Sequence, residues 1–337
     1  MNNETLTAER EPTTESGPPL LSIRGLSISV PDYPDSPLVD GVYLDVLRGE
    51  TVGLVGESGS GKSLTCMAAL NLLPSSLVVG GAVLLGGEDV RAMSPRRLRE
   101  VRGTKAAMIF QEPMSSLNPV LTVRQQIFEA LREPTYATSR DKRRRAIELL
   151  DLVGINQPER RLGQYPHEFS GGMCQRIMIA IAMAGDPEVL IADEPTTGLD
   201  VTIQAQVLQL LKDLTAELGM AMLLVSHDLG VIAQNCDRVC VMYAGRIVEQ
   251  GPVRSIFTSP THPYTEGLLQ SLPSIDGVWH RLPSLPGSVP TVTSMPSGCR
   301  YNPRCPLRID QCAVDVPPLQ DVADHHSVAC WVRGVQP

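Results

Sequence analysis

The sequence lacks an apolar run long enough to cross a membrane as a helix. Its longest uninterrupted apolar stretch extends only from Ile177 to Ala184, whereas a membrane-spanning helix needs about 20 apolar residues. Residues 1–19 contain almost no large apolar side chains, so we expect a disordered tail there and no secretory signal. If the protein works at a membrane, we expect it to do so through partner subunits.

The chain also lacks an excess of positive charge. It has 37 acidic and 29 basic side chains, which give a net charge of −8. Nucleic acid needs a basic surface to neutralise its phosphates, so the composition disfavours nucleic acid as the main partner. Nucleotide binding is still allowed, because a phosphate-binding loop uses backbone dipoles and a single lysine. With 337 residues, one large α/β domain and a small second one are expected.

A phosphate-binding loop is present in the first quarter of the chain. The apolar run at residues 52–55 is typical of a buried strand, and it leads into Gly-x-x-x-x-Gly-Lys-Ser at residues 56–63. Its glycines let successive N–H groups point at an anion, and a helix predicted over residues 62–73 directs its positive end there. We expect Lys62 to bind the β- and γ-phosphates and Ser63 to hold Mg²⁺. The predicted nucleotide-binding residues of this loop are Gly56, Glu57, Ser58, Gly59, Ser60, Gly61, Lys62 and Ser63.

Polar side chains also stand at the ends of three other predicted strands. They are Gln111, the pair Asp193 and Glu194, and His227. Ligands of parallel sheets bind beyond the carboxyl ends of the strands, so these groups are expected to meet the phosphates. A carboxylate and an amide oxygen suit Mg²⁺, and a second carboxylate can orient or deprotonate water. The strands in question are predicted over residues 106–110, 189–192 and 221–225.

A second glycine-rich turn opens a helix at Ser170, Gly171 and Gly172. Ser170 is suited to cap that helix, which is predicted to reach about residue 184, and the bare N–H groups after it form another anion site. The chain therefore contains two sites of phosphate-binding type. Gly-Leu-Asp at residues 198–200 follows later and precedes a predicted helix.

The remaining pattern places these motifs on an α/β framework. Tyr33 lies in a loop at residues 31–37, where stacking on an adenine ring and an ordinary loop position are equally good interpretations. Four further cysteines outside the tail, Cys66, Cys174, Cys236 and Cys240, are predicted to be buried or incidental thiols. Strands are predicted over 20–30, 42–46 and 82–85, and helices from residue 95 and over 123–132, 140–153 and 202–217.

In this order the motifs resemble those of the ATP-binding-cassette (ABC) ATPases, over roughly residues 20–255. The resemblance implies an α/β fold: a P-loop NTPase (RecA-like) core with a mostly parallel sheet, an antiparallel β subdomain and a helical insert at about 112–168. The matching family motifs are Walker A at 56–63, the Q-loop at Gln111, the signature at Ser170–Gly172, Walker B at 189–194, the D-loop at 199–200 and the H-loop at His227.

The resemblance also implies a role for each motif. Glu194 would be the catalytic base or water-polarising residue, with His227 at the γ-phosphate. Gln111 would join this catalytic group and also the Mg²⁺ ligands Ser63 and Asp193. Two cassettes of this family pack head to tail, so that the signature turn of one covers ATP on the P-loop of the other. Outside the P-loop, the residues expected to bind ATP are Gln111, Asp193, Ser170, Gly171, Gly172, Asp200 and Tyr33.

Further stretches resemble the oligopeptide/dipeptide branch of ABC importers, in which nickel importers share much of the pattern. They are residues 110–119, 165–173 and 262–269, the last opening a C-terminal extension at 256–337. This branch implies an ATPase at the cytoplasmic face of the membrane, attached peripherally to two permease subunits. It also implies a second cassette, either a copy or a different chain, and an extracytoplasmic peptide-binding protein.

Three alternatives remain open at this stage. A nickel or other small-solute importer keeps the same motifs. A non-transport ABC ATPase in a soluble complex also keeps them, although residues 112–168 show neither a basic DNA-binding face nor a coiled-coil pattern. A P-loop kinase explains residues 56–63 but leaves the signature turn and the Asp193–Glu194 pair without a role.

Four of the eight cysteines fall within 32 residues near the C-terminus, at Cys299, Cys305, Cys312 and Cys330. A cytosolic location disfavours disulfides, and C-x₅-C-x₆-C-x₁₇-C lacks the short pairs that usually bind zinc. Four thiolates can hold an iron–sulfur cluster, and the resemblance adds weight, since some peptide-importer ATPases carry such a cluster on this extension. We therefore expect a [4Fe–4S] cluster ahead of zinc, in a structural or regulatory role.

Overall fold

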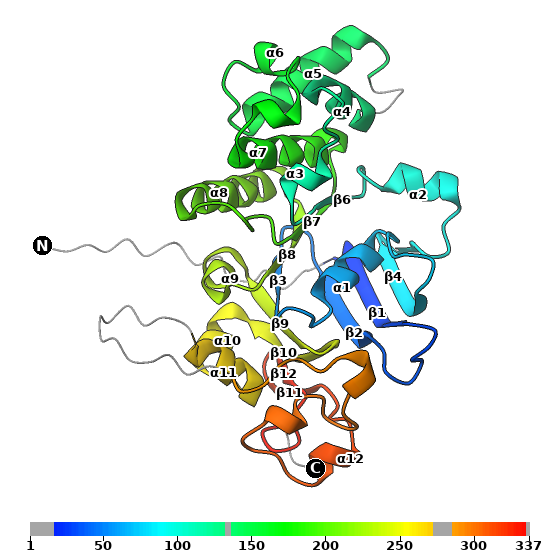
Figure 1. Ribbon diagram of the computed structural model, residues 1–337, viewed down its shortest axis with the longest axis vertical. Helices are drawn as coiled ribbons and strands as arrows, with labels where there is room; N and C mark the ends of the chain where they lie inside the picture. The colour runs from blue at the N-terminus through cyan, green and yellow to red at the C-terminus, as the bar shows by residue number, and fades with distance from the viewer. Residues whose placement is uncertain (1–16, 132–135, 272–284, 335–337) are drawn as a thin grey trace, which may run out of the picture.

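The computed structural model describes residues 17–131, 136–271 and 285–334 (Figure 1). Most of the expected disordered tail, residues 1–16, therefore lies outside the described residues. Within the described ranges, no helix is both long and apolar enough to span a membrane.

The centre of the molecule is an eight-stranded sheet with the order β11-β12-β10-β9-β3-β8-β7-β6. β3 pairs in parallel with β8 and β9, and β7 pairs in parallel with β6 and β8. β10, β12 and β11 continue the sheet in antiparallel fashion. The mostly parallel core is thus confirmed. The strands are β3 (Thr51–Val55), β6 (Ala106–Ile109), β7 (Val189–Asp193), β8 (Ala221–Ser226), β9 (Arg238–Tyr243), β10 (Arg246–Pro252), β11 (Gln320–Ala323) and β12 (His326–Val328).

The parallel strands are buried along nearly their whole length because both faces of the sheet are covered. Alternate residues of β7 serve different cores. Leu190 and Ala192 belong to a hydrophobic cluster shared with the helices of the upper part of Figure 1. Val189 and Ile191 belong to a second cluster, shared with α1 and the smaller sheet.

The smaller sheet is antiparallel and has the order β2-β1-β4-β5. The sequence predicted β1 one residue too long at each end and the next two strands too short at their N-terminal ends, and the expected antiparallel β subdomain is confirmed. Along β1 and β2, buried residues tend to alternate with more exposed ones, as expected for a sheet with one solvated face. The strands are β1 (Leu21–Ser29), β2 (Val39–Val46), β4 (Val78–Leu85) and β5 (Glu88–Asp89).

The P-loop helix α1 spans Lys62–Ala69 and is shorter than the predicted range of 62–73. Asn71 has a φ of 51°, and the N–H groups of Asn71 and Leu72 donate to the carbonyls of Ala68 and Met67 at 2.9 and 2.8 Å. This pair of bonds is a Schellman motif, which ends a helix at a left-handed residue. The prediction of a helix continuing to Pro74 was wrong because it ignored the left-handed tolerance of asparagine.

Between β6 and β7 the chain forms the helical lobe at the top of Figure 1. Its three longer helices, α4, α5 and α7, begin at side-chain caps: Thr122 accepts the N–H of Gln125, Thr138 that of Asp141, and Ser170 that of Met173. The predicted capping role of Ser170 is confirmed. The lobe contains α3 (Pro113–Ser116), α4 (Val123–Ala130), α5 (Ser139–Leu152), α6 (Pro158–Arg161), η1 (Pro166–Glu168), α7 (Gly171–Ala182) and η2 (Met183–Gly185).

The C-terminal extension is fastened to the core sheet. Its strand β12 pairs with β10, and the fully buried carboxylate of Glu249 in β10 accepts three hydrogen bonds from extension residues. The donors are the N–H groups of Thr261 (2.6 Å) and His262 (3.0 Å) and Nε2 of His326 (2.8 Å). The remaining helices are α2 (Pro95–Val101), α8 (Val201–Leu218), α9 (Leu229–Asn235), α10 (Val253–Thr258), α11 (Pro263–Gln270), η3 (Val292–Ser294), η4 (Asn302–Arg304) and α12 (Gln311–Val314).

Candidate active site

The P-loop connects β3 to α1 and leaves its backbone open to an anion. At Gly56 an added Cβ would lie 2.1 Å from the carbonyl oxygen of Met242, so no side chain fits there. Gly61 has a φ of 102° at the start of α1, a conformation that glycine adopts readily. Ser58 and Gly59 are exposed, whereas Ser60 is buried. This cradle, followed by a helix N-terminus, fits the phosphates of a nucleotide.

Lys62 and Ser63 begin α1 and face the end of β7. The Lys62 ammonium is nearly buried and donates to the carbonyls of Gly56 (2.8 Å) and Glu57 (3.0 Å). Burial lowers the pKa of Lys62, while the carboxylates of Glu194 and Asp193 act in the opposite direction. The lysine is therefore placed among the groups that would surround a bound phosphate.

The two oxygen ligands expected for Mg²⁺ lie together. Ser63 Oγ donates to Asp193 Oδ1 at 3.2 Å, and Asp193 is the buried last residue of β7. Burial raises the pKa of this carboxyl group, which the hydrogen bond from Ser63 and the charge of Lys62 partly oppose. Mg²⁺ is commonly held by one or two protein oxygens together with substrate phosphates and water, and this pair fits that arrangement.

Glu194 collects the strand-end groups of the sheet. Its Oε2 is reached by Gln111 Nε2 (3.0 Å), by His227 Nδ1 (3.2 Å) and by the hydroxyl of Thr197 (2.9 Å). Gln111 follows β6, Glu194 follows β7 and His227 follows β8, and these strands are neighbours in the sheet (Figure 1). The sequence prediction that these residues converge at one edge is therefore confirmed by geometry.

The backbone at Glu194 is unusual for a residue with a side chain. Its φ is 46°, in the left-handed region that costs most non-glycine residues free energy. The Glu194 N–H donates to the carbonyl of Val225 at 3.1 Å, which ties this turn to β8. The conformation aims the carboxylate back across the ends of β6 and β8 instead of continuing along β7.

The signature turn lies on a different part of the surface. In the described residues, no hydrogen bond or ion pair joins Ser170, Gly171 or Gly172 to the P-loop. An added Cβ on Gly172 would lie 2.7 Å from Ile203, so the glycine allows close packing of α7 on α8. Asp200 caps α8 by accepting the N–H of Ile203 at 3.0 Å. Within one chain these predicted ATP contacts are not brought to the P-loop.

The structure places Tyr33 in an exposed loop and the side chain of Glu57 against the extension. Tyr33 is 43% exposed in the loop between β1 and β2. Glu57 pairs with Arg304 of the extension, and its N–H donates to the hydroxyl of Tyr264 at 2.9 Å. Only the backbone of Glu57 faces Lys62.

The extension cysteines are all free thiols in one region. Burial and the neighbouring thiols raise the pKa of Cys299 to about 11. Among residues 17–131, 136–271 and 285–334, however, no three His, Cys, Asp or Glu side chains form a group able to hold a metal ion. The described side chains of Cys299, Cys305, Cys312 and Cys330 therefore do not support the expected cluster or zinc site.

The other four cysteines are structural. Cys66, Cys174 and Cys240 are buried and Cys236 is half-buried. Burial raises the pKa of all four thiols, so they are held as neutral thiols in the interior, as predicted.

Three residues of the site region were missed from the sequence. Thr197 supplies the third donor to Glu194. The only feature of the sequence that could have indicated this is that Thr197 lies three residues after Glu194. Tyr264 and Arg304 lie 207 and 247 residues from Glu57 in the chain, and no local pattern links such distant positions.

Comparisons with known proteins agree with this geometry. The sequence profile described as "ABC transporter" matches residues 39–197. The profile described as "Oligopeptide/dipeptide transporter, C-terminal region" matches residues 248–312.

Relatives match over nearly the whole chain. The oligopeptide transport ATP-binding protein AppD of Bacillus subtilis is 48% identical over 298 residues, covering 88% of this chain and 91% of AppD. The probable peptide ABC transporter ATP-binding protein y4tR of Sinorhizobium fredii is 51% identical over 294 residues, covering 86% of this chain and 88% of y4tR.

A solved structure shows the same cassette fold. The ATP-binding cassette MJ0796, solved as a dimer in a post-hydrolysis state with ADP and Pi, superimposes with a TM-score of 0.59 at 26% identity, covering 69% of this chain and 99% of that one. The chain belongs to the ABC transporter ATP-binding proteins, within the oligopeptide/dipeptide branch, and is an ABC-type ATPase.

Proposed function

We propose that this protein is the ATP-hydrolysing subunit that powers peptide import through membrane permease partners, attached peripherally at the cytoplasmic face of the membrane. The observation that carries the proposal is the meeting of Gln111, His227 and Thr197 on one oxygen of Glu194, beside the Ser63–Asp193 pair. The branch of the family, and the peptide-transport names of AppD and y4tR, support the choice of solute.

In this proposal the P-loop N–H groups and Lys62 bind the phosphates of ATP, while Ser63, Asp193 and Gln111 hold Mg²⁺. A Mg²⁺ ion held by these residues would supply positive charge against the phosphates. Glu194 orients a water molecule in line with the γ-phosphate and takes up its proton as the bond to ADP breaks. His227 and Thr197 fix the Glu194 carboxylate, and His227 also contacts the γ-phosphate.

The site needs a second cassette, because the signature turn lies away from the P-loop of its own chain. We infer that Ser170, Gly171, Gly172 and Asp200 complete the site of the partner cassette. The dimeric arrangement of MJ0796 supports this. Ser170→Arg should abolish turnover without weakening nucleotide binding to the isolated chain. Full activity in a strictly monomeric preparation would refute the pairing.

The central test is Glu194→Gln, which keeps the shape of the side chain but removes its charge. We expect MgATP binding to be retained and hydrolysis to fall at least about a hundredfold. Glu148→Gln on α5, an exposed residue far along the chain from the site, is the matched control and should hydrolyse ATP like the wild type. Unchanged hydrolysis in Glu194→Gln would refute the role assigned to Glu194.

The solute is tested in a system reconstituted with permeases and an extracytoplasmic binding protein. Peptide import is supported if labelled peptides are taken up with the wild-type protein but not with Glu194→Gln. Uptake of Ni²⁺ instead of peptides favours the nickel alternative. Crosslinks from residues 112–168 to a permease loop are expected, since Gln111 joins the site to the helical lobe. An ATPase that hydrolyses ATP but associates with no permease would favour the non-transport alternative.

For the extension we infer a separate metal site, with a [4Fe–4S] cluster as occupant and zinc as the alternative. Support comes from four free thiols gathered in one region. Anaerobic purification followed by iron, acid-labile sulfide and zinc assays decides between them. Cys299→Ser should lower the content of the bound metal, and stoichiometric zinc without sulfide would eliminate the cluster.

A further inference from the structure

Two residues of the extension, Arg304 and Tyr264, hold the P-loop at Glu57. The guanidinium of Arg304 donates to both carboxylate oxygens of Glu57, at 2.6 and 3.0 Å. The hydroxyl of Tyr264 accepts the Glu57 N–H at 2.9 Å. The Glu57 carbonyl, in turn, accepts the ammonium of Lys62 at 3.0 Å. A residue of the phosphate-binding loop is thus fixed on one side by the extension and linked on the other to the phosphate-binding lysine.

Arg304 is itself held rigidly. Its side chain is 6% exposed, and its Nε donates to the carbonyl of Pro286 at 2.7 Å. The guanidinium lies over the rings of Tyr243 and Tyr301, at 5.6 and 5.9 Å from their centroids. Tyr243 is the last residue of β9, and its ring packs against the rings of Tyr301 and Tyr264. The arginine therefore rests on a buried aromatic group that joins the core sheet to the extension.

The charge of Glu57 makes this contact important for nucleotide binding. A carboxylate in a loop that binds polyphosphate repels the ligand unless it is neutralised. The bidentate pair with Arg304 both neutralises that charge and turns it away from Lys62. A loop already fixed in place also avoids the entropy cost of ordering when the ligand binds.

We propose that Arg304 is a positioning residue for ATP, acting through Glu57, with Tyr264 as its helper. The extension then sets the affinity of the ATPase for MgATP. This proposal rests on the ATPase activity and not on the identity of the transported solute. Wild-type protein that hydrolyses no ATP even when paired with its second cassette would refute the ATPase itself, whereas the comparisons below concern only Arg304.

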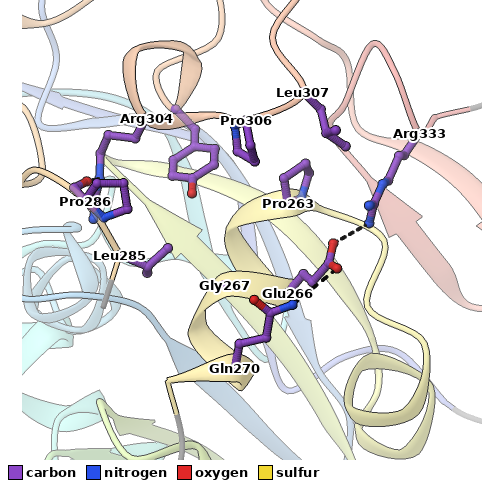
Figure 2. A pocket seen from close by; sticks show the side chains of 11 residues that line it. Pro263, Glu266, Gly267, Gln270, Leu285, Pro286, Arg304, Pro306, Leu307 and Arg333 are labelled. Carbon is purple, nitrogen blue, oxygen red and sulfur yellow. Dashed lines mark hydrogen bonds and ion pairs between the residues drawn. The ribbon is translucent and has the colours of Figure 1, made fainter. Parts of the chain in front are cut away.

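A matched control lies in the same cavity. Arg304 and Arg333 both line a cavity of about 340 Å³ in the extension (Figure 2). Arg333 pairs at 2.7 Å with Glu266, an ion pair that is about one third exposed and has no contact with the P-loop. Arg333→Ala removes the same charge from the same cavity and should leave the KM for MgATP unchanged.

The test compares KM and kcat for MgATP in the full-length chain assembled with its second cassette. In Arg304→Ala we expect KM to rise about tenfold, the loss typical of one charge-assisted pair, with kcat within about twofold. Such a split indicates lost binding shared by ground and transition states. Tyr264→Phe, which keeps its ring in the aromatic group, should raise KM about threefold. Melting temperatures check that each variant is folded.

Rescue separates charge positioning from simple loss of structure. Replacing Glu57 by Gln removes the charge that Arg304 neutralises, so Glu57→Gln combined with Arg304→Ala should have a lower KM than Arg304→Ala alone. A double variant no better than Arg304→Ala would overturn the proposal, and so would a wild-type KM in Arg304→Ala. If Arg304→Ala does not fold, a wild-type KM in Tyr264→Phe and in Arg304→Lys overturns it.

Discussion

Removing the carboxylate of Glu249 tests how the extension is attached to the core sheet. In Glu249→Leu, two backbone N–H groups, those of Thr261 and His262, and the ring of His326 all lose a buried acceptor. Each unsatisfied buried donor costs about 1–3 kcal/mol, and this substitution leaves three of them. We therefore expect a loss of about 3–5 kcal/mol in the free energy that holds the extension in place.

Trp331 offers a local probe for this measurement, since it lies in the extension and its indole N–H donates to the carbonyl of Asp315. The sequence has one other tryptophan, Trp279, so a Trp279→Phe background makes the fluorescence specific. Urea unfolding is then compared between Glu249→Leu and the control Glu266→Gln, which loses an exposed ion pair worth less than about 1 kcal/mol. A Glu249→Leu variant within about 1 kcal/mol of its parent would refute the reasoning.

Two further predictions follow from burial and sterics. His262 is fully buried, and burial lowers its pKa from 6.5 to about 3, so the unfolded chain binds a proton that the folded chain excludes. Stability should fall as pH drops below about 6.5, by up to about 1.4 kcal/mol per pH unit. In His262→Asn, which can still cap α11, the urea midpoint should change less between pH 7 and pH 5 than it does in the wild type. An equal change in both proteins would contradict this. Gly56→Ala places a Cβ against the Met242 carbonyl and should weaken MgATP binding at least about tenfold. Displacement of a fluorescent nucleotide measures this binding. The control Gly163→Ala, where the nearest atom to the added Cβ is 3.9 Å away, should bind MgATP like the wild type.

The parts of the site that could be predicted are those encoded by short local patterns. The loop at residues 56–63 and the strand ends at Gln111, Glu194 and His227 follow from apolar strands and the polar residues after them, because parallel strands bring their carboxyl ends to one edge. The alternating patterns of β1 and β2 likewise allowed these two strands to be predicted. In contrast, the end of α1 depended on one left-handed residue, Asn71.

The contacts that could not be predicted are the long-range ones. Arg304 and Glu57 form a pair because β12 adds to β10 and carries the extension to the P-loop. Nothing in the sequence near Arg304 distinguishes it from an exposed arginine in a proline-rich segment. The same limit applied to the four clustered cysteines, whose spacing says nothing about how closely their turns approach one another.

The strand order also determines which strand of the central sheet is exposed as an edge that another chain could pair with. β12 covers β10, whose backbone would otherwise form an unpaired edge beside the strongly apolar β9. The outermost strand, β11, has only the four residues Gln320–Ala323 and includes Asp321. Short, charged strands resist the addition of foreign strands, whereas open apolar edges favour aggregation. A cassette truncated before residue 320 is therefore expected to self-associate through β10, even where its nucleotide site is intact.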